Sequence, residues 1–112
     1  MGHHQMAQIY TASMRLSPYQ RDVIRRVTAD VASPSAKVFL FGSRIHPELR
    51  GGDIDLLIEL PQPHDDCFAL GIRIGAQIER QLGQQRLDIL VADPRTPDSP
   101  VLVAARRDAV PV

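Results

Sequence analysis

The chain has 112 residues, which is enough for one folded domain and too few for two. Apolar residues make up 44% and aromatic residues 4%, so a core can form from Ile, Leu, Val and Ala. Basic and acidic residues number 13 each, and this balance argues against a dedicated nucleic-acid-binding protein, which usually carries a basic excess. Cys67 is the only cysteine, so no intramolecular disulfide can form, and the first residues lack the apolar region of a signal peptide or membrane span. We therefore expect a cytoplasmic protein.

The first half of the chain is predicted to contain a tail, a helix and two strands. Residues 1–16 are expected to form a flexible tail before a single domain over residues 17–112. Ser17-Pro18 marks a helix start, because Ser is a favoured N-cap and Pro suits the first helical position. This helix should extend to about Ala32. The apolar run over residues 37–41 fits a buried strand, and an irregular loop separates it from a second strand over residues 53–60.

The second half is predicted to contain two helices and one strand. A helix over residues 65–82 carries Gly71 and Gly75, whose four-residue spacing suggests a flat face lying close on a sheet. A turn over residues 83–85 leads to a third strand over residues 86–91. A proline-containing connector then leads to a last helix over residues 99–109. The order helix, strand, strand, helix, strand, helix implies a small α/β layer structure.

Two aspartates at alternate positions of the second strand are the strongest chemical signal. Successive side chains of a strand point to opposite faces, so Asp53 and Asp55 share one face with Glu59, to which we assign no role. Two adjacent carboxylates repel each other when both ionise, and a divalent cation removes that penalty. Hard oxygen ligands suit Mg²⁺ or Mn²⁺. The alternative is a solvated strand face with two acidic residues.

Asp88 lies between Leu87 and Ile89 in the third strand. A charge in such an apolar segment is costly to bury unless it is paired or bound to a metal ion. If this strand lies beside the second, Asp88 can complete a cluster of three carboxylates. The alternative is an aspartate at the rim of the sheet that faces water.

Gly42-Ser43 follows directly on the first strand. Glycine lets the backbone approach a ligand closely, and exposed backbone N–H groups can hold phosphate oxygens. The Ser43 hydroxyl adds a donor. Nine residues separate Ser43 from Asp53, which is enough for the chain to loop back to an adjacent strand.

Taken together, these motifs resemble the nucleotidyltransferase superfamily related to DNA polymerase β, and within it the minimal nucleotidyltransferase (MNT) family. The resemblance covers about residues 36–92 and is carried by three segments in order: Gly42-Ser43, Asp53-Ile54-Asp55-Leu56 and Leu87-Asp88-Ile89. It implies the polymerase β-like nucleotidyltransferase fold. That fold is α/β (α+β), with a small mixed β-sheet and helices packed on one side.

The resemblance also implies roles for individual residues. Gly42 and Ser43 match the pair that contacts the triphosphate, and Arg44 is either a further phosphate contact or an exposed loop arginine. Two Mg²⁺ ions, or Mn²⁺, would be held by three carboxylates: Asp53, Asp55 and Asp88. The last of these also matches the carboxylate that helps to activate the attacking hydroxyl. ATP is the expected substrate.

The expected partner follows from the resemblance and from the short segment after Asp88, which cannot form an acceptor-binding domain. Minimal nucleotidyltransferases are typically encoded beside HEPN-domain toxins, which implies an antitoxin that transfers AMP to a tyrosine of a HEPN ribonuclease. Two alternatives stay open. One is an antitoxin that neutralises its partner by binding alone, and the other is a small-molecule (antibiotic) nucleotidyltransferase. We expect a homo- or hetero-oligomer in which a partner buries part of residues 98–112, with Val101, Leu102 and Val103 as candidate contacts.

Overall fold

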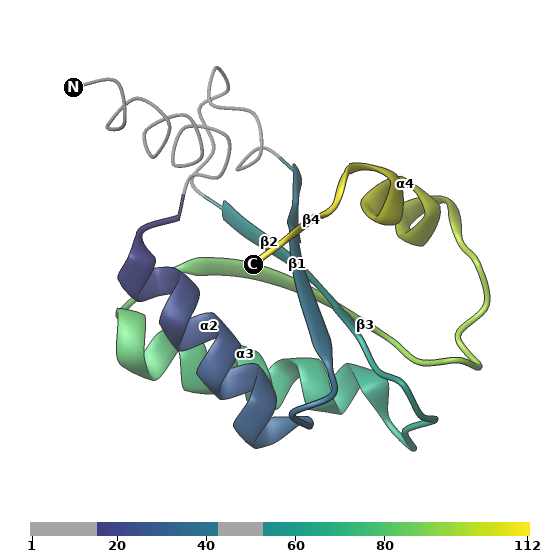
Figure 1. The fold of residues 1–112 in the computed structure, drawn as a ribbon, viewed down its shortest axis with the longest axis horizontal. Coiled ribbons are helices and arrows are strands. Elements are labelled where there is room, and N and C mark those ends of the chain that lie inside the picture. Colours follow the sequence, from purple (N-terminus) through teal and green to yellow (C-terminus); the bar gives the residue numbers. More distant parts are fainter. Residues whose placement is uncertain (1–15, 43–52) are drawn as a thin grey trace.

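The structure is a computed structural model that describes residues 16–42 and 53–112. Its helices and strands, shown in Figure 1, follow in this order: α2 (Pro18–Val31), β1 (Lys37–Phe41), β2 (Asp53–Glu59), α3 (Cys67–Leu82), β3 (Arg86–Ala92), α4 (Pro100–Asp108) and β4 (Val110–Pro111). Each predicted helix and strand is present, with ends that agree to within two residues, whereas β4 was not predicted. No helix in the described ranges has the length and apolar character needed to cross a membrane.

The four strands form one mixed sheet in the order β3-β2-β1-β4. β1 pairs with both β2 and β4 in antiparallel fashion, and β2 pairs with β3 in parallel. The parallel pair is possible because α3 carries the chain from the end of β2 back to the start of β3, as a parallel crossover requires. The predicted class, an α/β fold with a small mixed sheet, is therefore confirmed.

Strand alternation divides the apolar residues between the two faces of the sheet. One face packs against α2 and α3 and holds the larger core, which includes Ile24, Leu40, Leu56 and Ile74. These two helices lie side by side, as Figure 1 shows. The other face holds a smaller cluster around Leu57, against which α4 packs. The fold therefore adds a helix on the second face, next to the strand segment that carries the acidic residues.

α2 begins where the sequence places its start. The Gln20 backbone N–H donates to Ser17 Oγ at 3.0 Å, and the Ser17 N–H donates to Gln20 Oε1 at 2.8 Å, which forms a capping box. Leu16 precedes the cap and is only 4% exposed within the larger core. In the last turn of α2, Thr28 is also buried, and its Oγ1 is without a hydrogen-bond partner among the described residues.

The predicted close approach of α3 to the sheet is confirmed at its two glycines. A Cβ atom at Gly71 would lie 3.2 Å from Val91 Cγ2, and one at Gly75 would lie 3.3 Å from Ile89 Cδ1. Both contacts are tighter than ordinary van der Waals packing, so a larger residue would push the helix away from β3. Glycine at these positions therefore sets the spacing between α3 and the edge strand.

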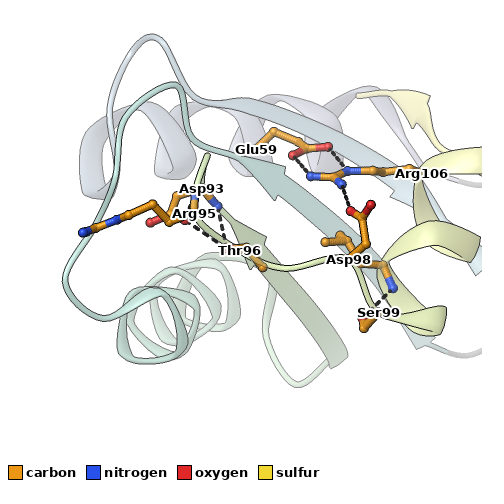
Figure 2. Close-up of polar contacts among 8 residues, drawn as sticks. Glu59, Asp93, Arg95, Thr96, Asp98, Ser99 and Arg106 are labelled. Carbon is orange, nitrogen blue, oxygen red and sulfur yellow. Dashed lines mark hydrogen bonds and ion pairs between the residues drawn. The ribbon is translucent and has the colours of Figure 1, made fainter.

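Two polar networks hold the segments around α4, and Figure 2 shows both. Arg106 of α4 makes a two-point ion pair with Glu59 of β2, with Nε and Nη2 each 2.9 Å from a carboxylate oxygen, and its Nη1 lies 3.1 Å from Asp98 Oδ1. Glu59 thus has a structural partner that its position in the sequence did not indicate. α4 is therefore tied to the same strand that carries Asp53 and Asp55.

The second network is centred on Asp93, the buried residue that follows β3. Its carboxylate accepts the His64 backbone N–H at 2.8 Å, the Arg95 N–H at 2.9 Å and the Thr96 hydroxyl at 3.0 Å. The His64 N–H is the largest influence that lowers the pKa of Asp93 to about 2, with the Thr96 hydroxyl and the Arg95 N–H adding to it against the effect of burial. The carboxylate thus joins the connectors that follow β2 and β3.

Candidate active site

The three predicted aspartates lie on one face of the sheet, at the start of two neighbouring strands. Asp55 of β2 is the register partner of Asp88 of β3, and Asp53 is the register partner of Arg86. Paired residues of adjacent strands project to the same face about 5 Å apart. The prediction that the third strand lies beside the second is therefore confirmed, and Asp55 and Asp88 are direct neighbours.

The carboxylates of Asp55 and Asp88 repel each other when both are ionised. The pKa of Asp55 is raised to about 6, first by burial and then, in decreasing order, by the negative charge of Asp88, a hydrogen bond with the Asp88 carboxyl and the charge of Asp53. A group with this pKa exchanges its proton close to neutral pH. A cation bound between Asp55 and Asp88 would relieve the same repulsion that the proton relieves.

Asp53 is held by a different interaction. Its Oδ1 lies 3.3 Å from Nε of Arg86, whose side chain is 85% exposed. Within residues 16–42 and 53–112, no group of three or more His, Cys, Asp or Glu side chains lies close enough to hold one metal ion together. The assignment of Asp53, Asp55 and Asp88 as joint metal ligands therefore stays a prediction. Arg86 was not singled out in the sequence, although its place two residues before Asp88 puts it on the same strand face.

Gly42 closes the site from the side of β1. It has a positive φ of 78°, and a Cβ atom there would overlap Oδ2 of Asp55. Only glycine combines this backbone conformation with such a close approach. The backbone at the end of β1 therefore lies directly against the Asp55 carboxylate, where the sequence motif predicts a phosphate contact. Ser43 and Arg44 lie outside the described residues, and their triphosphate contacts stay predictions.

Comparison with known protein families identifies the type of reaction that this site supports. The sequence family described as "Nucleotidyltransferase domain" matches residues 21–103, which includes Gly42 and all three aspartates. The chain belongs to the nucleotidyltransferase domain family. A search of curated proteins finds no individual protein that matches this chain. The family match supports a transferase that moves a nucleotidyl group, and family members generally use a nucleoside triphosphate and a divalent metal ion.

The nucleotidyltransferase site fits a divalent cation on two observations. Asp55 and Asp88 are adjacent oxygen donors whose mutual repulsion is partly relieved by a shared hydrogen bond. Gly42 leaves no side chain between the end of β1 and Asp55, so the backbone forms a cradle that a Cβ would fill. Carboxylate oxygens beside exposed backbone are suited to Mg²⁺ with bound phosphate. Asp53 lies on the same face and contacts Arg86.

Proposed function

We propose that this nucleotidyltransferase transfers AMP from ATP, with Mg²⁺, to a tyrosine hydroxyl of a HEPN ribonuclease toxin in the cytoplasm, and so acts as its antitoxin. The observation that carries the transfer step is the Asp55–Asp88 register pair beside Gly42. The HEPN partner and the antitoxin role rest on the sequence resemblance to minimal nucleotidyltransferases.

The proposed reaction is an in-line displacement at the α-phosphorus of ATP. The tyrosine oxygen forms a bond to the α-phosphorus, the bond from that phosphorus to the bridging oxygen of the β-phosphate breaks, and pyrophosphate leaves. Asp88 takes the proton of the tyrosine hydroxyl, a role that suits an exposed carboxylate at the start of an edge strand. The protein product is an AMP phosphodiester on tyrosine.

The other site residues bind and orient. Asp53 and Asp55 would hold Mg²⁺, and Asp88 would share it. Bound Mg²⁺ neutralises triphosphate charge and lowers the pKa of the attacking hydroxyl. The Gly42 backbone, with Ser43 and Arg44 beyond it, would contact the phosphates. The pair of Arg106 and Glu59 fixes α4 on the same sheet face, at the other end of β2 from Asp53 and Asp55.

A protein acceptor is favoured by the surface of α4. Val101 and Val103 are 60% and 48% exposed, whereas Leu102 is 4% exposed and packs against the sheet. The expectation that Leu102 offers a contact to a partner is therefore wrong, because it belongs to the smaller core. Val101 and Val103 remain candidate contacts. This exposed pair equally suits an antitoxin that neutralises its partner by binding alone.

The test is transfer of label from α-labelled ATP, with Mg²⁺, to the product of the neighbouring gene, the proposed HEPN-domain partner. We expect label on a tyrosine, located by mass spectrometry, with the wild-type protein and with Asp30→Asn, a control on the exposed side of α2. Asp53→Asn should lose the transfer. Neutralisation of the ribonuclease by Asp53→Asn at the wild-type level would instead establish binding alone. Transfer to an antibiotic without any protein partner would establish the small-molecule alternative.

A further inference from the structure

Two arginine–carboxylate pairs lie on the same strand face and differ in geometry. Arg106 grips Glu59 through two nitrogens at 2.9 Å and also contacts Asp98, with a side chain that is 37% exposed. The ion pair of Arg86 with Asp53 is longer, with Nε 3.3 Å from Oδ1, and the Arg86 side chain is 85% exposed. A two-point, partly covered pair fixes a helix in place, whereas a longer, exposed pair holds its partner weakly.

Arg86 lies on the same sheet face as the three aspartates of the site. Arg86 and Asp88 point to the same side of β3, and their register partners are Asp53 and Asp55. The Arg86 guanidinium and the three carboxylates therefore occupy four adjacent positions on the sheet face. β3 is an edge strand and Arg86 is its first residue, so the guanidinium can turn without displacing a neighbouring strand.

We propose that Arg86 is a positioning residue that exchanges partners during the reaction cycle. Before metal binds, the guanidinium is a counter-ion of Asp53. When a divalent cation takes the Asp53 carboxylate, the two positive charges repel each other, and Arg86 turns to the triphosphate of the incoming nucleotide. This proposal rests on the proposed function, because it needs both a metal ion and a nucleoside triphosphate at the site.

The chemistry of the side chain suits both partners. A guanidinium presents a planar fork of donors that matches both carboxylate and phosphate oxygens. Its present contact is weak enough for a divalent cation to displace. The gain from a phosphate contact then comes only when nucleotide and metal are bound together. Arg86 therefore opposes metal binding in the absence of nucleotide and favours nucleotide binding in the presence of metal.

The test measures binding in two steps and needs no catalysis. Mn²⁺ is titrated calorimetrically into the nucleotide-free protein, and a non-hydrolysable ATP analogue is then titrated in the presence of saturating Mg²⁺. The variants are Arg86→Gln and the control Arg73→Gln, an exposed arginine of α3 on the other side of the sheet. We expect Arg86→Gln to bind Mn²⁺ about threefold more tightly, since an exposed ion pair is a weak competitor. It should bind the ATP analogue at least about fivefold more weakly, since a charge-assisted hydrogen bond is lost. Arg73→Gln should match the wild type in both titrations.

A double variant separates the proposed exchange from a general effect of charge. In an Asp53→Asn background, Arg86→Gln should no longer tighten Mn²⁺ binding, because the competing carboxylate is gone. Unchanged Mn²⁺ and nucleotide affinities in Arg86→Gln, or weaker Mn²⁺ binding, would overturn the role of Arg86 and leave the proposed function intact. Absence of Mn²⁺ and nucleotide binding by the folded wild-type protein would instead overturn the proposed function itself.

Discussion

Gly42→Ala tests whether the end of β1 must lie against Asp55. Gly42 has a φ of 78°, a conformation that costs a non-glycine residue about 1–3 kcal/mol. The added Cβ would also overlap Asp55 Oδ2. Turning Asp55 away from its rotamer costs about 0.5–1.5 kcal/mol, and losing its hydrogen bond with Asp88 costs about 1 kcal/mol. We expect a loss of about 2.5–5.5 kcal/mol in the free energy of unfolding.

Gly83→Ala is the matched control, because Gly83 ends α3 with a φ of 82° and a Cβ there would meet nothing within 4 Å. It carries the backbone strain of about 1–3 kcal/mol without the contact to Asp55. Urea unfolding and Mn²⁺ titration below the unfolding transition give the two readouts. We expect Gly83→Ala to bind Mn²⁺ like the wild type and Gly42→Ala to lose that binding. Equal stability losses together with wild-type Mn²⁺ affinity in both variants would refute the reasoning.

Three further predictions concern the scaffold. Thr28→Val should raise the free energy of unfolding by about 1 kcal/mol in urea, because it removes a buried hydroxyl without a partner among the described residues; a destabilised variant would contradict this. The pKa of Asp93 is lowered to about 2, so its contribution to stability is complete above about pH 4 and is lost as pH falls from there to about 2. Asp93→Asn should therefore show a shallower loss of stability in acid, and an unchanged acid unfolding curve would count against the network. Arg106→Gln should destabilise the protein by about 1 kcal/mol and speed hydrogen exchange in α4, whereas Arg107→Gln, whose ion pair with Asp108 is 3.9 Å long and exposed, should change neither.

The elements that sequence patterns predicted well are those set by local chemistry. The start of α2 follows from a serine cap and an adjacent proline, and the structure contains both together with a capping box. β1 has the predicted limits because its short apolar run ends just before Gly42, whose positive φ turns the chain out of the strand. The spacing of Gly71 and Gly75 likewise predicted a close contact that the structure contains.

The features that escaped prediction depend on how distant segments meet. β4 has two residues and includes Pro111, which is compatible with an edge strand and carries almost no local signal. The pair of Arg106 and Glu59 joins residues 47 positions apart, and that of Arg86 and Asp53 requires the register of β2 against β3. Sequence alternation shows which face a residue occupies and leaves open which residue lies opposite.

The candidate site shows the same division. Alternation within β2 predicted that Asp53 and Asp55 share a face, and the predicted adjacency of the third strand brought Asp88 beside Asp55. The elevated pKa of Asp55 could not be predicted, because it depends on burial and on the direct contact with Asp88. The ion pair between Asp53 and Arg86 also depends on the register of β2 against β3, which the sequence does not show.

The most direct test of nucleotidyl transfer at this site is the rate at which Asp88→Asn labels the proposed HEPN partner from α-labelled ATP with Mg²⁺. If Asp88 takes the proton of the acceptor, the rate should fall by at least about a hundredfold, while Asp30→Asn keeps the wild-type rate. The variant should remain folded, because Asp88 is exposed and its replacement removes a repulsion with Asp55. Labelling by Asp88→Asn at the wild-type rate would contradict the assignment of the Asp55–Asp88 pair as the centre of the reaction.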